Sequence, residues 1–361
     1  MRGSLRASSV HPVVRVTGNF ASEGPLSPPV REALLAAFDQ GWADPKKLSQ
    51  VASKAAILRN QSIENIAAKL KIPSASIEIL GEPSLGHFLA ISGFLRAGST
   101  FAYSSIDKGK VRAIARSQGL AHLEMPTDPE GQIIFPDSFP NQTTLSLQLA
   151  NGETGLFQRD SSAAEKARFI AVDATSSGSR IPLPAKWDSA LFDSRSWNGP
   201  AGISILAIVN RADFAYPLPH IAPISVPGSY SLPLLIASSI ALDFFEDASS
   251  QMRGYLVDGL QKIAGVEVVG AELPALNNVL SCVIRGVRNE AIVRQLATRG
   301  IDVDAGSACS PADLQPSHVV ASMGFATDGH LRFTLRSETT KEEINLLLAS
   351  LQEIISLERK I

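Results

Sequence analysis

Apolar and polar positions change their period repeatedly along the first two thirds of the chain. Residues 29–70 carry apolar positions at helical spacing, with a break around residues 42–47. Residues 77–81 are predicted to form a strand, and Pro83 marks the start of an apolar helix over residues 85–95. Further strands are predicted at 100–103, 144–149, 169–172, 189–192 and 203–209, with helices over 108–118 and from 163. Strand and helix in turn predict a mostly parallel sheet with helices on both faces.

The pattern changes after Pro233. One long helix is predicted over residues 232–262, followed by shorter strands and helices to the end of the chain. The last helix has a capping box, in which Thr340 is the N-cap and Glu343 follows three residues later. We therefore divide the chain into an N-terminal arm, a large α/β domain and a small C-terminal α+β domain, at residues 1–18, 19–235 and 236–361.

Composition and charge exclude several classes of partner. The chain has 361 residues, of which 45% are hydrophobic and 19% charged, as in an ordinary soluble protein with a substantial core. Its net charge of -2 argues against a nucleic-acid partner, because nucleic-acid binders usually carry a basic stripe. The first 20 residues lack the unbroken apolar segment of a signal peptide, and the most apolar stretch, residues 232–245, is too short and polar to span a bilayer. We expect no membrane partner.

The two cysteines have different surroundings. Cys282 lies in an apolar run that predicts a buried strand, whereas Cys309 lies in a loop of glycine, serine and alanine. They do not form a disulfide framework, so a reducing cytoplasm is the expected compartment. The six histidines show no metal-ligand spacing, and no metal site is predicted.

Short motifs follow one another in a fixed order along the chain. They are Ala-Asn-Gly-Glu-Thr-Gly at 150–155, Val-Asp-Ala at 172–174, Gly-Pro-Ala-Gly at 199–202, Gly-Ser-Ala-Cys at 306–309, Pro-Ser-His at 316–318 and Leu-Arg-Phe-Thr-Leu at 331–335. In order and spacing the chain resembles the cysteine desulfurases of the class V aminotransferase family, from about residue 19 to its end. The resemblance implies the fold-type I fold of pyridoxal-phosphate enzymes, with a large and a small domain. It also implies a dimer whose site lies at the subunit interface.

The same resemblance assigns roles to particular residues. In the family, a lysine holds pyridoxal phosphate as a Schiff base and an aspartate, here Asp173, pairs with the pyridine nitrogen. A mobile cysteine, here Cys309, carries sulfur as a persulfide, and an arginine, here Arg332, binds the substrate carboxylate. Ser229, in a Gly-Ser pair, matches the residue that reaches the phosphate of the neighbouring subunit. Asp173 has a structural pairing role as its alternative, and Arg332 an ion pair at the domain interface.

The chain departs from the family at most other cofactor positions. Ser196 stands where the Schiff-base lysine is expected, and a hydroxyl cannot form an imine. Arg195 replaces a histidine beside it and is a candidate for binding the phosphate, although it is expected to pair first with Asp193. Four further replacements are Asp193 for a phosphate-binding serine, Pro83 for a threonine of the phosphate loop, Gly152 for an asparagine and Ser176 for a glutamine. Because each hydrogen bond to a charged group contributes roughly 1.5–3 kcal/mol, several losses predict weak cofactor binding.

Three functions follow as hypotheses. The leading one is a pseudoenzyme that does not form the aldimine and acts as a subunit in or near sulfur transfer or iron–sulfur assembly, dimerised with itself or with an active paralogue. The second is a working desulfurase or class V aminotransferase with atypical cofactor binding, in which the cofactor is loosely bound and some other base acts. A lysine from elsewhere would serve it; Lys108, Lys110 and Lys186 are the candidates, each with the alternative of an ordinary surface lysine. The third is a persulfide acceptor that uses Cys309.

Overall fold

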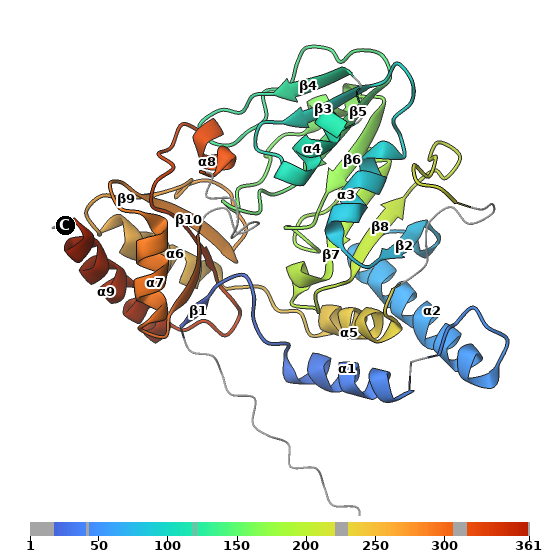
Figure 1. Cartoon of the computed structure of the whole chain (residues 1–361), viewed down its shortest axis with the longest axis horizontal. Helices are drawn as coiled ribbons and strands as arrows, with labels where there is room; N and C mark the ends of the chain where they lie inside the picture. Colours follow the sequence, from blue (N-terminus) through green and yellow to red (C-terminus); the bar gives the residue numbers. More distant parts are fainter. Residues whose placement is uncertain are drawn as a thin grey trace, which may run out of the picture.

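The computed structural model describes residues 18–40, 43–117, 119, 121–220, 230–305 and 316–359. Two sheets organise these residues. A seven-stranded sheet with its helices forms the larger part of the molecule, and a five-stranded sheet with its helices forms the smaller part, at the left of Figure 1. The predicted fold class, a large α/β domain and a small α+β domain, is confirmed.

The larger sheet has the strand order β2-β8-β7-β6-β5-β3-β4. Its strands are β2 (Ile77–Leu80), β3 (Thr100–Ser104), β4 (Ala121–Met125), β5 (Thr143–Gln148), β6 (Phe169–Asp173), β7 (Ser189–Asp193) and β8 (Ser204–Ile208). Strands β3 to β7 pair in parallel, whereas β8 runs antiparallel to both β7 and β2. The carboxyl ends of β3, β5, β6 and β7 therefore share one edge, which is where ligands bind in open α/β sheets.

Helices pack on this sheet and on one another. They are α1 (Pro28–Gln40), α2 (Gln50–Leu70), α3 (Pro83–Ser92), α4 (Gly109–Ser117) and α5 (Leu232–Asp243). Helix α5 packs against α1 and α2, and its apolar side chains belong to the same core as the sheet (Figure 1). The helix expected from residue 163 is a single 3-10 turn, Ser162–Lys166, with others at Ser74–Ser76 and Ser194–Trp197.

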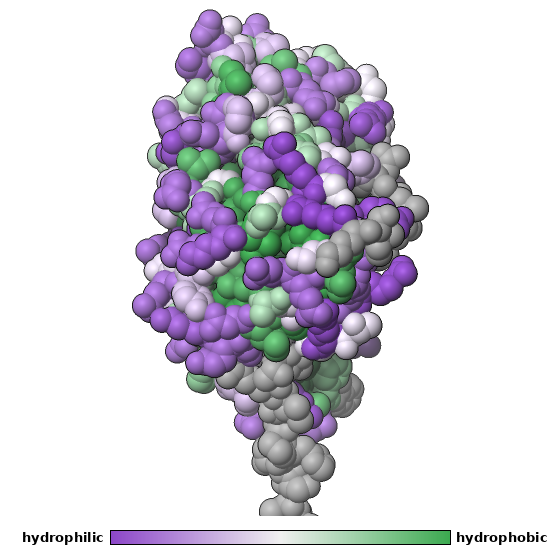
Figure 2. All heavy atoms as spheres, turned by 90° about the vertical axis from the view of Figure 1, so that its left-hand side faces the viewer, coloured by the Kyte–Doolittle hydropathy of each residue, from purple (hydrophilic) through white to green (hydrophobic). Residues whose placement is uncertain are grey.

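The smaller sheet has the order β1-β11-β12-β10-β9. Its strands are β1 (Asn19–Phe20), β9 (Val266–Val268), β10 (Val279–Ile284), β11 (Asp302–Ala305) and β12 (His330–Thr334); its helices are α6 (Ser250–Gln261), α7 (Asn289–Ala297), α8 (His318–Ser322) and α9 (Lys341–Glu358). Figure 2 views the molecule from this side, where hydrophilic side chains surround a smaller hydrophobic area. The capping box is confirmed, because Thr340 and Glu343 bond to each other's backbone N–H groups at the start of α9.

The long helix predicted over residues 232–262 is wrong. The chain leaves α5 at Phe244 and starts α6 at Ser250. Between them, Asp247 forms an ion pair of 2.6 Å with the buried guanidinium of Arg180 and accepts a hydrogen bond from Asn277. This break therefore brings a carboxylate to a cation that burial would otherwise leave without a charge partner.

Two of the predicted domain limits fall inside helices or strands of the structure. Residue 235 lies inside α5, and Asn19 lies in β1, which pairs with β11 of the smaller sheet. In the described part of the chain, no helix is long and apolar enough to cross a membrane. The same residues contain no group of three side chains that could bind a metal ion.

Candidate functional site

Asp173 is the centre of a buried polar cluster at the carboxyl edge of the parallel strands. It ends β6 and is 3% exposed. Its Oδ1 accepts hydrogen bonds from the Thr175 amide at 2.9 Å and the Thr175 hydroxyl at 2.5 Å. Lys108, just after β3, places Nζ 3.2 Å from Oδ2, and His87 of α3 places Nε2 3.9 Å from the same oxygen. Three elements thus bring an ammonium, a hydroxyl and an imidazole to one carboxylate.

The charges of this cluster follow from burial and from these contacts. Burial by itself would raise the pKa of Asp173, but Lys108, His87 and the Thr175 hydrogen bonds outweigh it and hold the pKa below its ordinary value. Burial lowers the pKa of His87 to about 4, against the opposite influence of Asp173. At neutral pH the cluster therefore contains an ion pair between Asp173 and Lys108, beside a neutral imidazole.

Asp107 adds a second buried carboxyl group that the sequence analysis did not identify. It is fully buried, and Oδ2 accepts a hydrogen bond from the Ser104 amide at 2.9 Å. Burial raises its pKa to about 7, more than the Ser104 hydrogen bond lowers it. The available signal was its position just after β3, because residues that follow parallel strands meet at one edge. Its carbonyl oxygen also lies 2.8 Å from Nε2 of His318, in the small domain.

Ser196 is held tightly in the turn that follows β7. Its hydroxyl donates a 2.6 Å hydrogen bond to the carbonyl of Asp193. Gly178 lies against it, because a Cβ built on this glycine would come 2.5 Å from the Ser196 hydroxyl oxygen. Arg180 donates a hydrogen bond to the carbonyl of Ser196. The hydroxyl is therefore turned onto the backbone of its own turn.

Arg195 and Asp193 form an ion pair within the same turn. The guanidinium Nη2 lies 2.6 Å from Asp193 Oδ2, and the Arg195 amide donates to Oδ1 at 3.0 Å. Asp193 is buried, whereas more than half of the Arg195 side chain is exposed. The carboxylate at this position thus has a cation from two residues further along the chain.

The N-terminus of α3 lies at the same edge of the sheet and is capped by Glu82. Its carboxylate accepts hydrogen bonds from the amides of Ser84 at 2.7 Å and Leu85 at 2.6 Å, and Pro83 occupies the first helical turn. Burial alone would raise the pKa of Glu82, but these hydrogen bonds and the nearby Lys110 lower it. Lys110 also donates to the Ser84 hydroxyl. An acidic residue directly before a helix-starting proline was the sequence signal for this cap.

Arg332 lies between the two domains. Its Nη2 is 2.6 Å from Asp304 Oδ2, and Nη1 donates a 3.1 Å hydrogen bond to the carbonyl of Gly152 in the large domain. Beside it, Glu153 accepts hydrogen bonds from the hydroxyls of Ser281 and Ser317, both in the small domain. Arg332 thus pairs with an acidic residue on the neighbouring strand of its own sheet and contacts the large domain through a hydrogen bond, and its role stays a prediction.

Two predicted site residues, Cys309 and Ser229, lie outside the described residues. The other cysteine, Cys282, is buried in β10 as expected, and burial raises the pKa of its thiol to about 12. A thiol of this kind is protonated at neutral pH and is a poor nucleophile.

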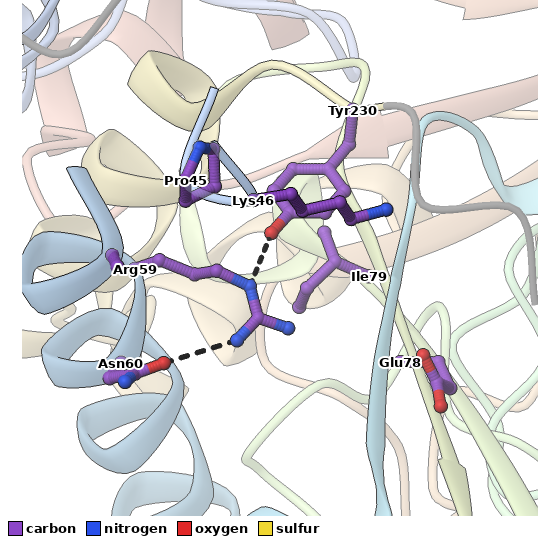
Figure 3. Close-up of a pocket in the computed structure, with 8 residues that line it drawn as sticks. Pro45, Lys46, Arg59, Asn60, Glu78, Ile79 and Tyr230 are labelled. Atoms are coloured by element: carbon purple, nitrogen blue, oxygen red, sulfur yellow. Dashed lines mark hydrogen bonds between the residues drawn. The ribbon is translucent and has the colours of Figure 1, made fainter. Parts of the chain in front are cut away.

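A cavity of about 400 Å³ lies away from this cluster, between α2 and the edge strand β2 (Figure 3). Arg59 reaches into it from α2, donating to the Tyr230 hydroxyl at 2.7 Å and to Asn60 at 3.1 Å. Lys46 and Glu78 also line it. Of the predicted site residues that the structure describes, none lies in its wall.

Known proteins resemble this chain over most of its length. Residues 224–347 match the model of the aminotransferase class-V family. The cysteine desulfurase IscS of Dictyoglomus turgidum is 25% identical, over 93% of this chain and 93% of its own, and that of Methanosarcina thermophila is 24% identical, over 92% and 89%. Among solved structures, a NifS-like protein superposes with a TM-score of 0.82 at 19% identity, over 94% of this chain and all of its own. A NifS-like protein from Rickettsia africae gives 0.80 at 17% identity, over 94% and 99%.

Proposed function

The chain belongs to the aminotransferase class-V family, and we propose that it is a pseudoenzyme related to the cysteine desulfurases. In this proposal it forms no aldimine with pyridoxal phosphate and acts in the cytoplasm as a dimer subunit in or near sulfur transfer or iron–sulfur assembly. The observation that carries the proposal is Ser196, which stands at the position of the Schiff-base lysine and donates its hydroxyl hydrogen to the carbonyl of Asp193.

The residues present do not fit a covalently held pyridoxal phosphate. The serine has no amine, and its hydroxyl packs against Gly178. Each of the three alternative lysines has contacts of its own. Lys108 pairs with Asp173, Lys110 bonds to the Ser84 hydroxyl, and Lys186 donates to two backbone carbonyls.

The proposed dimer is supported by large apolar side chains that are exposed on α1 and near the start of α2. Leu35 and Phe38 on α1 are 51% and 55% exposed, and Leu48, just before α2, and Val51 in its first turn are exposed as well. Exposed apolar side chains of this size gain free energy when a partner covers them. The partner in our proposal is a second copy of the chain or an active cysteine desulfurase paralogue.

Reduction with borohydride in the presence of pyridoxal phosphate tests the proposal directly. We expect peptide mapping to find no specific pyridoxyl-lysine, and we expect no alanine to form from cysteine. An active cysteine desulfurase treated in parallel is the control for both measurements. A specific pyridoxyl group on Lys108, Lys110 or Lys186, together with alanine production, would instead establish a working enzyme with an unusual cofactor lysine.

A role for Cys309 as persulfide acceptor is compatible with this proposal and is tested separately. The chain is incubated with an active desulfurase and cysteine and then analysed by mass spectrometry. Persulfide on Cys309 that is absent from the Cys309→Ser variant would add sulfur relay to the binding role, whereas an unmodified thiol would leave the role of binding subunit alone.

A further inference from the structure

Two side chains at the carboxyl edge of the parallel strands have the charges that a bound cofactor would present to this protein. We infer that Lys108 and Glu82 take the places of the cationic pyridine ring and the anionic phosphate of pyridoxal phosphate, so that the chain excludes even the non-covalently bound cofactor. This inference rests on the proposed function and extends it from the missing imine bond to the loss of non-covalent cofactor binding.

The first replacement is at Asp173. In the family that the chain resembles, this aspartate pairs with the ring nitrogen of the cofactor. Here Lys108 Nζ lies 3.2 Å from one carboxylate oxygen and 3.5 Å from the other, and it also contacts the Thr175 hydroxyl. A buried carboxylate needs one cation to offset its desolvation, and the ammonium group of Lys108 is already that cation. A pyridinium would have to displace the ammonium to reach Asp173.

The second replacement is at the N-terminus of α3. The free amides and the helix dipole at such a terminus form a binding site for phosphate. In this chain the Glu82 carboxylate accepts the hydrogen bonds of the Ser84 and Leu85 amides, and Pro83 contributes no N–H group. A phosphate dianion would have to displace the like-charged Glu82 from these amides.

The two replacements belong to one pocket. His87 lies on α3, one turn after the capped terminus, and its Nε2 is 3.9 Å from Asp173. Burial has the largest effect on its pKa, and the charges of Lys108, Lys110 and Asp193 also act on it. Lys110 bonds to Ser84 at the capped terminus, and Gly152 lies beside Lys108, because a Cβ on this glycine would come 3.7 Å from Lys108 Cε. The polar groups that would contact the two ends of the cofactor are therefore already neutralised by one another.

Tethering makes this internal neutralisation hard to reverse. A group held by the same chain competes at an effective concentration of roughly millimolar or more. Free cofactor at micromolar concentration competes poorly with one such group, and here it has to displace two. Substitution of Ser196 alone therefore leaves the main obstacle to cofactor binding in place.

Pyridoxamine 5′-phosphate is the probe that tests this inference, because it carries the ring nitrogen and the phosphate but needs no lysine for binding. Calorimetric titration is carried out on the full-length wild-type protein, on Lys108→Ala, on Glu82→Ser and on the double variant. Glu82→Ser keeps a helix-capping hydroxyl and removes the charge. We expect no measurable binding to the wild type and binding to the double variant that is at least about tenfold tighter than to either single variant.

Controls separate this result from a general loosening of the fold. Lys186→Ala and Glu130→Ser remove a lysine and a glutamate elsewhere on the protein, and neither variant is expected to bind the probe. If Lys108→Ala does not fold, Lys108→Met keeps most of the side-chain volume without the charge. Tight binding of pyridoxamine 5′-phosphate to the wild type, or a folded double variant with no gain in affinity, would overturn the inference. The first outcome would leave the missing aldimine at Ser196, and therefore the proposed function, intact.

Discussion

At the scale of single residues, Asp173 and Ser196 show how far a motif can locate a site. Both were assigned from short sequence patterns, and the structure places Asp173 at the end of β6 and Ser196 in the turn after β7. The ion pair between Asp173 and Lys108 could not be predicted from the sequence, because the direction of a lysine side chain after β3 depends on which strands become neighbours. Strand β5 lies between β3 and β6 in the sheet, so the pairing spans two strand spacings and has no local signal.

Substitution of Ser196 by lysine is the direct test of whether a lysine at this one position is enough for an aldimine to form. We expect Ser196→Lys to give no stable absorbing aldimine with pyridoxal phosphate, because Lys108 remains on Asp173 and Glu82 remains on the terminus of α3. Absorbance spectra and borohydride mapping measure the result, with Ser194→Lys, two residues away, as the position control. A tightly bound, absorbing cofactor in the Ser196→Lys variant would show that the rest of the pocket is intact.

The raised pKa of Asp107 predicts a specific dependence of stability on pH. The folded protein keeps this carboxyl group protonated up to about pH 7, whereas the unfolded chain releases the proton near its ordinary value of 3.8. The free energy of unfolding contributed by this group therefore falls as pH rises from 5 to 7, by about 2 kcal/mol. We expect Asp107→Asn to abolish this part of the pH dependence, since an amide does not ionise.

Urea unfolding of the wild type and Asp107→Asn at pH 5, 6, 7 and 8 measures the difference. The buried histidines, His87 and His330, titrate in both proteins, so their contributions cancel in the comparison. Asp39→Asn, at an exposed position of α1, is the matched control and should follow the wild type. Parallel pH profiles for all three proteins would contradict the assignment of a raised pKa to Asp107.

At the scale of helices and strands, the sequence predicted the parts of the fold with strong periodicity. The central strands are continuous apolar runs of about five residues, and every residue of β5, β6 and β7 is buried. The break between α5 and α6 was missed, because the residues before and after it are equally compatible with a helix. The segment between the two helices contains a tertiary interaction that periodicity does not reveal, the pairing of Asp247 with Arg180 from a segment about 70 residues earlier in the chain.

The capping box of α9 makes a prediction at this scale. The Thr340 hydroxyl accepts a hydrogen bond from the Glu343 amide at 3.3 Å, and Glu343 Oε2 accepts one from the Thr340 amide at 2.8 Å. Thr340→Ala removes the first of these, and we expect it to lower the free energy of unfolding by about 1 kcal/mol. Thr340→Ser keeps the hydroxyl and should differ from the wild type by only a few tenths of that amount. Equal urea midpoints for Thr340→Ala and Thr340→Ser would contradict this role of the cap.

At the scale of the whole molecule, contacts between distant parts of the chain hold the start of the described residues in the smaller sheet and connect the two sheets. Strand β1, near the start of the described residues, pairs with β11, and Arg336 donates to the carbonyls of Asn19, Ala21 and Glu23. The loop at Gly152 and Glu153 bonds to the small domain through Arg332, Ser281 and Ser317. These pairs are separated by up to 317 positions in sequence, so periodicity gives no information on them. They fix the small domain beside the buried cluster at the carboxyl edge.

The proposed dimer gives the prediction at this scale. We expect sedimentation at micromolar concentration to detect a dimer, either of the chain with itself or with an active cysteine desulfurase. The surface we assign to it includes Leu35 and Phe38, which are half exposed on α1 although apolar side chains of this size gain free energy on burial, roughly 1.5–3 kcal/mol each.

Replacing both side chains by glutamate in one variant would place two charges in that interface and should weaken association at least about tenfold. Leu346→Glu, on the exposed side of α9, puts a charge on an equally exposed leucine far from α1 and should leave association unchanged. Circular dichroism establishes that both variants keep the fold. Because α1 packs on α5 through its other face, a folded protein that has lost only its association is the expected result for the double variant. A chain that stays monomeric at every accessible concentration, alone and when mixed with an active desulfurase, would remove the dimer from the proposed function.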